Sequence, residues 1–181
     1  MTTGYAGTRS DRIGERLFNL VITHVPSHTL RQAWLRRFGA TIGRGSSIML
    51  GTTVFGARRL VIGDDVSIGS SVLLDARGGI LVENDAVLAS DVHVITGDHD
   101  PDSPDFGTRY GPVAIGHHAW IASRATVLRD VTIGAGGVVG AASLVRKDVG
   151  PLQIVAGVPA AVVGRRNSDL TYSAHFRPIL T

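Results

Sequence analysis

The chain has 181 residues, of which 44% are apolar and 18% charged, which suits one domain with a substantial core and is too short for two ordinary domains. It holds no cysteine, which excludes disulfide scaffolds, thiolate zinc sites, iron–sulfur clusters and cysteine nucleophiles. No apolar run approaches the ~18–20 residues of a membrane span and no signal peptide opens the chain, so we expect a soluble, cytoplasmic protein.

Positive charge is concentrated in the N-terminal part of the chain. Residues 1–39 hold six arginines and two acids, whereas residues 40–181 hold twelve basic and thirteen acidic residues. The main body therefore lacks the basic face that binding to a phosphate backbone requires. We expect no nucleic-acid partner, although the sequence pI is 9.9.

Residues 1–39 are predicted to carry two short amphipathic helices separated by Pro26. The apolar residues with helical spacing are Ile13, Leu17, Leu20 and Val21, then Leu30, Trp34 and Phe38. Two interpretations stay open for this segment. It caps the open end of the structure that follows, or it rests on an anionic membrane surface as a peripheral contact. The arginines of the polar side are Arg12, Arg16, Arg31, Arg36 and Arg37.

From residue 40 onward, aliphatic residues recur at every sixth position, with frame breaks between blocks. The positions are Ile42, Ile48, Val54, Ile62, Ile68, Leu74, Val82, Leu88, Val94, Ile115, Ile121, Val127, Ile133, Val139 and Val145. The residue two positions before each of them is apolar or small. Two inward positions around one outward position are typical of short strands.

Strands this short, joined at a six-residue interval, favour a solenoid whose triangular coil takes three hexapeptides. The sequence thus predicts an all-β solenoid of about five coils over residues 40–149, with each face a stack of parallel strands. A turn is expected to begin at the glycines that follow inward aliphatics: Gly43, Gly63, Gly69, Gly116, Gly134 and Gly140. An extended loop interrupts the repeat at 97–112, and residues 150–181 are expected to form a C-terminal strap and tail.

The loop at 97–112 is the first candidate for function, because a long excursion from a rigid repeat usually carries one. Its aspartates resemble a calcium loop, but Ser103 stands at the required glycine and Arg109 at the required glutamate. His99 is the residue of interest. A lone loop histidine is either solvated or catalytic, and its spacing does not decide between the two.

Five motifs follow in a fixed order. They are Gly97–Pro101 (GDHDP), Trp120–Ser123 (WIAS), Val131–Gly134 (VTIG), Gly140–Val149 (GAASLVRKDV) and Gly157–Ala160 (GVPA). This order closely resembles the galactoside and maltose O-acetyltransferase group of the hexapeptide-repeat, left-handed parallel β-helix family, and more so its exopolysaccharide and nodulation-sugar relatives. The resemblance covers residues 40–166. It implies a left-handed solenoid, a homotrimer, and direct acetyl transfer from acetyl-coenzyme A to a sugar hydroxyl, with no metal.

The resemblance also implies roles for single residues. His99 would be the general base that removes the proton of the acceptor hydroxyl, a task that suits an imidazole. Ser123 would donate a hydrogen bond to the tetrahedral oxyanion, or it is only a solvated turn serine. Asp98 and Asp100 either orient the imidazole or serve as turn residues.

For the acetyl donor, the resemblance implies a groove between coils of adjacent subunits. Trp120 would line it, and backbone groups near Ala141 and Ser143 would pair with the amides of coenzyme A. The phosphates would meet Lys147, Arg165 and Arg166. Arg146 departs from the Thr or Val usual at that position, and either adds a phosphate contact or is a solvent-facing charge.

For the acceptor, the sugar-binding Asn of the family falls near Gly69, Ser70 or Ser71, so its amide is absent and a simple galactoside is not expected. The substrate-binding candidates are Ser71 and, at the corner of the second coil, Asp75 and Arg77.

Three other functions stay open. An amino-sugar N-acetyltransferase would use the same base, and a non-catalytic assembly platform would share the fold. A zinc hydratase of the carbonic anhydrase type would hold zinc with three histidines across a subunit boundary, two from neighbouring strands and one from a partner chain. The histidines that prompt this comparison are His93, His99, His117 and His118. Against the hydratase, His93 precedes an inward residue and His117 and His118 share one turn.

Overall fold

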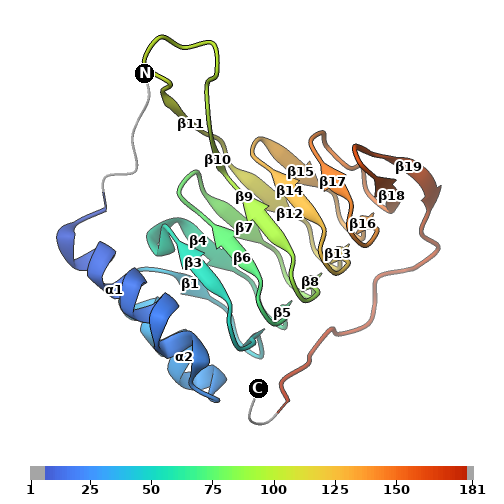
Figure 1. The fold of residues 1–181 in the computed structure, drawn as a ribbon. Coiled ribbons are helices and arrows are strands. Elements are labelled where there is room, and N and C mark those ends of the chain that lie inside the picture. The colour runs from blue at the N-terminus through green and yellow to red at the C-terminus, as the bar shows by residue number, and fades with distance from the viewer. Residues whose placement is uncertain (1–6, 179–181) are drawn as a thin grey trace.

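The computed structural model describes residues 7–178 of the chain. It is a left-handed parallel β-helix with three flat faces, and two helices cover its first coil (Figure 1). Each coil contributes one strand to each face, and successive coils pair in register as parallel strands. The solenoid predicted from the six-residue period is confirmed.

The three faces are called sheets A, B and C. Sheet A holds β1 (Thr41–Ile42), β4 (Leu60–Ile62), β7 (Ile80–Val82), β12 (Val113–Ile115) and β15 (Val131–Ile133). Sheet B holds β2 (Ser47–Ile48), β5 (Ser67–Ile68), β8 (Val87–Leu88), β13 (Trp120–Ile121), β16 (Val138–Val139), β18 (Gln153–Gly157) and β19 (Ala160–Arg165). Sheet C holds β3 (Thr53–Phe55), β6 (Leu73–Asp75), β9 (His93–Ile95), β14 (Thr126–Leu128) and β17 (Leu144–Val145).

Five coils are complete and a sixth is partial. Val149 extends sheet A by a bridge to Ile133, and β18 extends sheet B by pairing with β16. The antiparallel strand β19 then folds back on β18. The extended loop forms a separate hairpin of β10 (Gly97–His99) and β11 (Thr108–Tyr110), which projects from the corner between sheets C and A (Figure 1).

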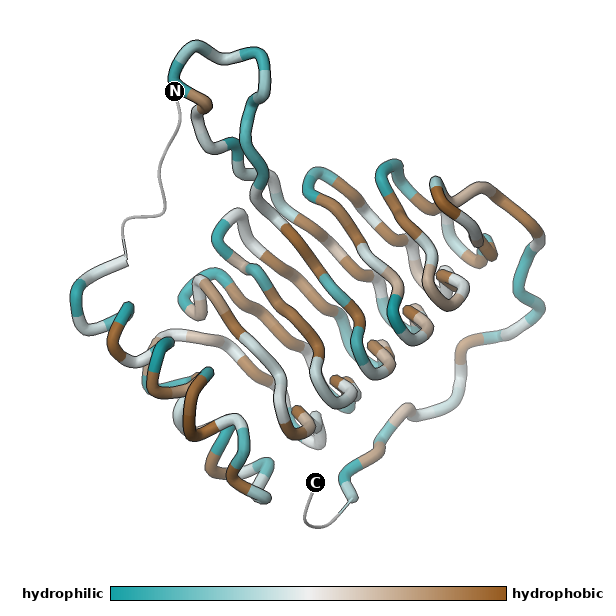
Figure 2. The backbone as a smooth tube through the Cα atoms, in the orientation of Figure 1, coloured by the Kyte–Doolittle hydropathy of each residue, from teal (hydrophilic) through white to brown (hydrophobic). Residues whose placement is uncertain are grey.

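The core is a column of the residues that the period selects. All fifteen inward aliphatics are buried, and none is more than 7% exposed. The fifteen partners two positions earlier are buried as well, including the polar Ser46, Thr52 and Ser143. Figure 2 shows the resulting recurrence of hydrophobic segments along the stacked strands.

The corner glycines are needed for a reason other than the predicted one. A Cβ on Gly69 would lie 2.6 Å from the backbone nitrogen of Ser90, and one on Gly116 would lie 2.7 Å from that of Ala135. These glycines therefore make room for the next coil. The left-handed backbone conformation falls two positions later, as at the A–B corner: Gly45, Asp65, Asp85, His118, Gly136 and Leu152.

The N-terminal segment folds as α1 (Arg9–Leu20), the short 3₁₀ helix η1 (Ile22–His24) and α2 (His28–Arg37), and a second 3₁₀ turn, η2 (Ala57–Arg59), follows β3. In the described residues no helix is long and apolar enough to cross a membrane. The orientation of α1 differs from the prediction. Phe18 is buried against the first coil, while the expected apolar face at Ile13, Leu17 and Leu20 points outward.

The helices cover the first coil mainly with polar side chains, because the edge of that coil presents unpaired backbone groups. Donors from the cap reach carbonyls of the coil: Asn19 to Val54 (3.0 Å), Thr23 to Thr52 (2.7 Å), Arg31 to Ile48 (2.9 Å), Gln32 to Ser46 (2.6 Å) and Arg36 to Ile42 (2.9 Å). This explains why Arg31, predicted on the solvent side of its helix, is fully buried. The cap interpretation therefore has a specific basis in edge protection.

Asp11 stabilises the start of α1 and joins this helix to Arg58 of η2, at the C–A corner of the first coil. It forms a capping box with Thr8, and its carboxylate accepts hydrogen bonds from Nε and Nη2 of Arg58, both at 2.9 Å. The Asp11 side chain is only 3% exposed. The hydrogen bond from Arg58 holds the pKa of this carboxyl far below its ordinary value, against the opposing effect of burial.

After β19 the tail turns back along the A–B corner and reaches the cap (Figure 1). Nε2 of His118 donates to the carbonyl of Tyr172 (2.7 Å), and the backbone of Ala174 donates to Asp85 (2.9 Å). Farther along, His175 contacts Asp65 (2.8 Å). At the end of this course, Arg177 donates to Thr29 of α2 (3.0 Å). Residues 172–177 thus contact the fourth, third and second coils in turn and then α2.

Asp11→Asn is expected to lower the free energy of unfolding by about 1–3 kcal/mol, because a buried charge-assisted pair is lost. Since the pKa of Asp11 is depressed in the folded state, its contribution is fully present above the ordinary aspartate pKa of ~4 and is lost as the pH falls toward the folded value. Urea unfolding at neutral and acidic pH measures both effects. The exposed Asp102→Asn is the control, and equal stability loss in the two variants would contradict this role for Asp11.

Candidate active site

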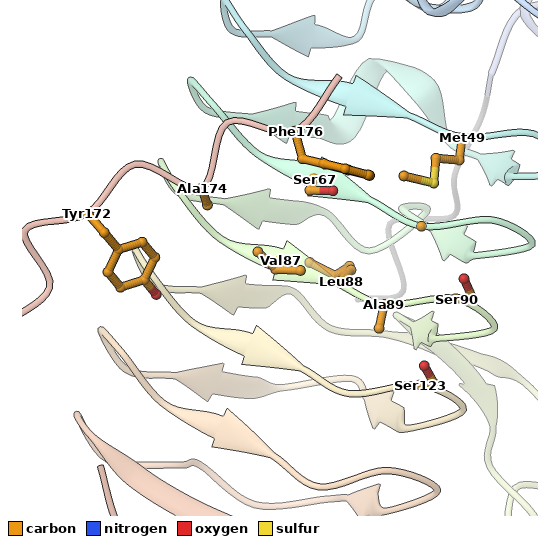
Figure 3. Close-up of a pocket in the computed structure, with 11 residues that line it drawn as sticks. Met49, Ser67, Val87, Leu88, Ala89, Ser90, Ser123, Tyr172, Ala174 and Phe176 are labelled. Atoms are coloured by element: carbon orange, nitrogen blue, oxygen red, sulfur yellow. The ribbon is translucent and has the colours of Figure 1, made fainter. Parts of the chain in front are cut away.

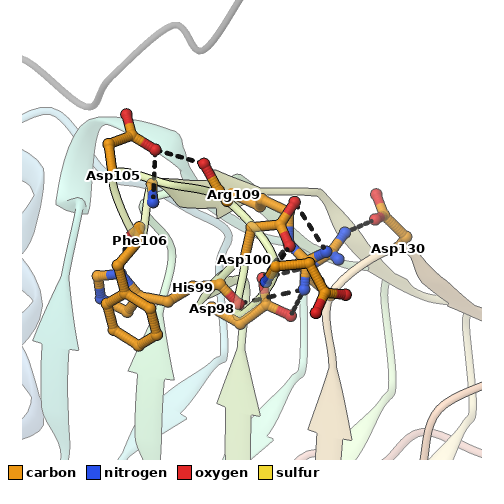
Figure 4. Close-up of polar contacts among 11 residues, drawn as sticks. Asp98, His99, Asp100, Asp105, Phe106, Arg109 and Asp130 are labelled. Carbon is orange, nitrogen blue, oxygen red and sulfur yellow. Dashed lines mark hydrogen bonds and ion pairs between the residues drawn. The ribbon is translucent and has the colours of Figure 1, made fainter.

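Asp98 joins the hairpin of β10 and β11 both internally and to the solenoid (Figure 4). Asp98 accepts from Arg109 on the opposite strand (3.0 Å) and lies 2.9 Å from Nε of Arg129 at the corner of the fourth coil. Burial would raise the pKa of Asp98, but the hydrogen bond from Arg109 and the charge of Arg129 outweigh it and leave that pKa lowered. The hairpin therefore has a charged attachment at its base.

The imidazole of His99 is oriented by Phe106. Its Nδ1 lies 2.8 Å from the carbonyl oxygen of Phe106, and the two rings stack with centroids 4.5 Å apart (Figure 4). A carbonyl can only accept, so Nδ1 carries the hydrogen and Nε2 of the neutral ring keeps its lone pair. Phe106 has a φ of 49°, an unusual conformation for a bulky residue. The residue whose carbonyl fixes the His99 tautomer therefore has a strained backbone conformation itself.

Asp75 and Arg77 lie at the foot of the same hairpin. The Arg77 guanidinium makes a bidentate pair with the buried Asp75 at 2.7 and 2.8 Å, and it lies 5.5 Å from the ring centroid of Tyr110 on β11. Hydrogen bonding to Asp75 raises the pKa of Arg77 above its ordinary value. The corner acid is therefore buried and paired, although a residue at a corner is usually exposed.

Ser123 and Ser71 lie at the other end of sheet C. Both follow strands of sheet B, at the B–C corner, whereas His99 follows β9 at the C–A corner. Because β9 and β14 pair side by side, the width of sheet C separates Ser123 from His99 within one chain. The two predicted catalytic residues do not meet in a single copy.

Ser123 opens instead onto a groove along the outside of sheet B (Figure 3). The groove holds about 440 Å³. Its floor includes Ser67 and Val87, and the tail supplies Tyr172 and Phe176 as the opposite wall. This groove is partly apolar and runs from Ser123 at the B–C corner toward the cap.

Two of the residues expected to contact coenzyme A, Ser143 and Arg166, form hydrogen bonds within the chain. Ser143 is 1% exposed, its hydroxyl accepts from the backbone of Gly157 (3.0 Å), and its own backbone oxygen accepts from Thr126 (2.8 Å). Arg166 donates to the carbonyl of His118 (2.8 Å) and to the hydroxyl of Tyr172 (2.6 Å). Ser143 thus closes the last coil and Arg166 fastens the tail, and their contacts with coenzyme A stay a prediction.

The remaining donor candidates are exposed, on different sides of the last coils. Trp120 is 48% exposed on sheet B, and Ala141 lies at the B–C corner. Arg146 and Lys147 lie at the C–A corner, on the side of the His99 hairpin, while Arg165 ends β19. In one copy these five residues are therefore spread over sheet B, the B–C corner, the C–A corner and the end of β19.

Three histidines do not converge here. Across residues 7–178, no group of three or more His, Cys, Asp or Glu side chains is arranged to hold a metal ion. Nδ1 of His117 contacts Nδ1 of His118 at 3.0 Å, and the other nitrogen of His118 is engaged by the tail. Within one copy, His99, His117 and His118 therefore make local contacts with Phe106, with each other and with the tail.

Sequence reasoning missed Phe106, Arg129 and Tyr172. Phe106 is an aromatic residue in an otherwise polar loop, which is a signal that could have been used. Arg129 contacts Asp98 across 31 positions, and Tyr172 contacts His118 across 54, with no periodic pattern to indicate either pair.

Comparison with known proteins agrees with this fold. No family model matches the chain. An acetyltransferase named for colanic acid biosynthesis, WcaF of Escherichia coli K12, is 35% identical over 132 residues, covering 73% of this chain and 72% of the relative. An O-acetyl transferase named for lipopolysaccharide biosynthesis, WbbJ of the same organism, is 30% identical over 144 residues, with coverage of 73% and 72%.

Among solved structures, a hexapeptide-repeat acetyltransferase of Vibrio cholerae, VCA0836, in complex with acetyl-coenzyme A superposes with a TM-score of 0.82. It is 24% identical, and the match covers 88% of each chain. The identity to WcaF extends over more than two thirds of both chains, and the fold agrees with that of VCA0836. The chain is therefore a member of the hexapeptide-repeat acetyltransferase family, and its activity is acyl transfer.

Proposed function

We propose that the chain transfers an acetyl group from acetyl-coenzyme A to a hydroxyl group of a sugar or glycosylated acceptor, in the cytoplasm. The observation that carries this proposal is the fixed tautomer of His99, whose Nε2 is left as a proton acceptor at the edge of the molecule. Two relatives are named for the synthesis of sugar polymers, and a structural neighbour was solved with acetyl-coenzyme A. These findings support the acceptor class and the donor.

In the proposed reaction, Nε2 of His99 removes the proton of the acceptor hydroxyl as its oxygen attacks the thioester carbonyl. The negative charge that develops on the carbonyl oxygen is stabilised by the hydroxyl of Ser123. As the carbon–sulfur bond breaks, His99 returns the proton to the departing sulfur. The acetylated acceptor and free coenzyme A are the products, and no covalent enzyme intermediate forms.

The site is proposed to be shared between copies in a homotrimer. Because sheet C separates His99 from Ser123 in one chain, a neighbouring copy must bring its B–C corner to the C–A corner of the first. On this arrangement, Asp75 and Arg77 would contact the acceptor beside His99. Ser71 would lie on the opposite wall with Ser123.

The donor is proposed to lie along the last coils. The exposed Lys147 and Arg146 share the C–A corner with the His99 hairpin, and their charges suit the phosphates of coenzyme A. Trp120, Ala141 and Arg165 would come from the partner's surface or from the same chain farther along the groove. Within residues 7–178, Arg146 and Lys147 form no ion pair with a carboxylate. An imidazole base and such cations fit a thioester donor that carries phosphates.

His99→Ala is expected to lower kcat by about 10²–10⁴-fold, because the proton acceptor is removed. The imidazole is exposed, so the melting temperature should stay near that of the wild type. Steady-state kinetics with labelled acetyl-coenzyme A and a panel of sugars measures the effect. His93→Ala on the neighbouring strand is the control, and a His99→Ala enzyme with more than about a tenth of wild-type turnover would sink the assignment.

Mixing subunits tests whether the site is shared. His99→Ala and Ser123→Ala should each be strongly impaired alone, the second by about 10²–10³-fold. If one site takes His99 from one chain and Ser123 from the next, each mixed trimer should recover about a third of the wild-type activity, because one of its three interfaces joins the two intact residues. Co-expression with two affinity tags isolates the mixed species. No recovery in a verified mixed trimer would show that both residues act within one chain.

Lys147→Ala is expected to raise the KM for acetyl-coenzyme A by about three- to tenfold while kcat changes little, because a partly solvated phosphate contact is lost. Arg124→Ala is the matched control, because this exposed arginine at the B–C corner lies as far as 3.9 Å from the carboxylate of Asp91. Initial rates at varied donor concentration separate the two constants. An unchanged KM in Lys147→Ala would remove this residue from the donor site.

A further inference from the structure

The helix α1 has two apolar faces, and only one is used by the fold. Gly14 and Phe18 face the first coil and are buried. On the outward side, Ile13 is 53% exposed, Leu17 43% and Leu20 74%. Val21, directly after the helix, is 55% exposed. Single exposed apolar residues need no explanation, but a continuous stripe of four is a candidate interaction surface.

A stripe of arginines runs beside these apolar residues. Arg9, Arg12 and Arg16 lie at helical spacings that place them on one side of α1, and none makes an ion pair within residues 7–178. Together with Ile13 they line a hollow of about 440 Å³. Three unpaired guanidinium groups around one hollow suit a phosphate-bearing partner.

The carboxylates of the same helix point the other way. Asp11 is paired with Arg58, and Glu15 accepts from the backbone nitrogens of Gly56 and Ala57 at 3.0 and 3.2 Å. Both acids of α1 are therefore directed at the first coil. The helix has separated its charges, with the anions facing inward and the cations outward.

We propose that this outward surface docks on an anionic lipid bilayer. The lipid face, as we call it, consists of Arg9, Arg12, Ile13, Arg16, Leu17, Leu20 and Val21. Adjacent apolar and arginine stripes are the pattern of a helix that lies in the plane of a membrane interface. With 12 residues and a length of about 18 Å, α1 is too short to span a bilayer but can lie along one. A second copy on the same face would bring unpaired arginines against one another.

Flotation with vesicles tests the proposal on the full chain. The protein should float with vesicles of phosphatidylcholine and phosphatidylglycerol at low salt, and not with phosphatidylcholine alone. Arg12→Gln/Arg16→Gln should weaken partitioning about 25-fold, because each arginine near an anionic surface contributes about a fivefold effect. Leu17→Gln/Leu20→Gln should weaken it at least about tenfold through lost apolar burial.

Two control variants are matched to these changes. Arg124→Gln/Arg146→Gln removes two exposed arginines of the fourth and fifth coils, and Val163→Gln removes an apolar side chain that is 64% exposed on β19. Both should float like the wild type. All substituted side chains are exposed, so circular dichroism and melting temperature should not change and loss of folding can be excluded directly.

The absence of cysteine allows a direct measurement of contact. Leu20→Cys can be labelled at a single position with an environment-sensitive fluorophore, and Val163→Cys supplies the control at the far end of the solenoid. Anionic vesicles should shift the emission to the blue at position 20 and leave position 163 unchanged.

Three results would overturn the proposal. The first is failure to float with anionic vesicles, and the second is equal flotation with neutral ones. The third is a change in sedimentation mass on Leu17→Gln/Leu20→Gln without any vesicle binding by the wild type, which would assign the lipid face to a second copy of the chain. None of these readouts depends on acetyl transfer, so they leave the proposed function untouched.

Discussion

Backbone pairing between successive coils is the constraint on which this structure depends. Each coil can satisfy its donors and acceptors only if the next coil stacks on it in register, close enough for hydrogen bonds at every short strand. That requirement removes side chains from corner positions such as Gly69 and Gly116, where the neighbouring backbone passes. It also leaves the first coil with an open edge, which the cap covers with Asn19, Arg31 and Gln32 rather than with apolar residues alone.

The same constraint explains what could be predicted from the sequence. A periodic backbone requires a periodic core, so the inward positions from Ile42 to Val145 were all identified correctly. A contact that occurs only once in the fold leaves no periodic pattern in the sequence from which it could be predicted. The outward orientation of Leu17 and the burial of Arg31 follow from where single donors find carbonyls of the first coil, and no spacing in α1 or α2 reports that. The apolar spacing of α1 was real, but it marked a face that the fold leaves open.

In the candidate site, too, some features could be predicted from the sequence and others could not. His99 could be selected because a long loop interrupts the repeat, and the motif order singled out the region around Trp120 and Ser123. The sequence drew attention to the two neighbouring aspartates, but the ring is fixed by the carbonyl and ring of Phe106, whose only signal was an aromatic residue in a polar loop. The internal use of Ser143 and Arg166 likewise depends on the path of β18, β19 and the tail, which the repeat does not determine.

The course of the tail has a consequence for how the molecule unfolds. Stacked repeats interact only with their neighbours, so an ordinary solenoid can fray from either end one unit at a time. Here the segment that leaves the last coil reaches the cap of the first, with contacts at His118, Asp85, Asp65 and Thr29 on the way. Opening either end therefore strips contacts from the other. The tail turns a linear array into a closed cooperative unit, whose coils gain and lose order together.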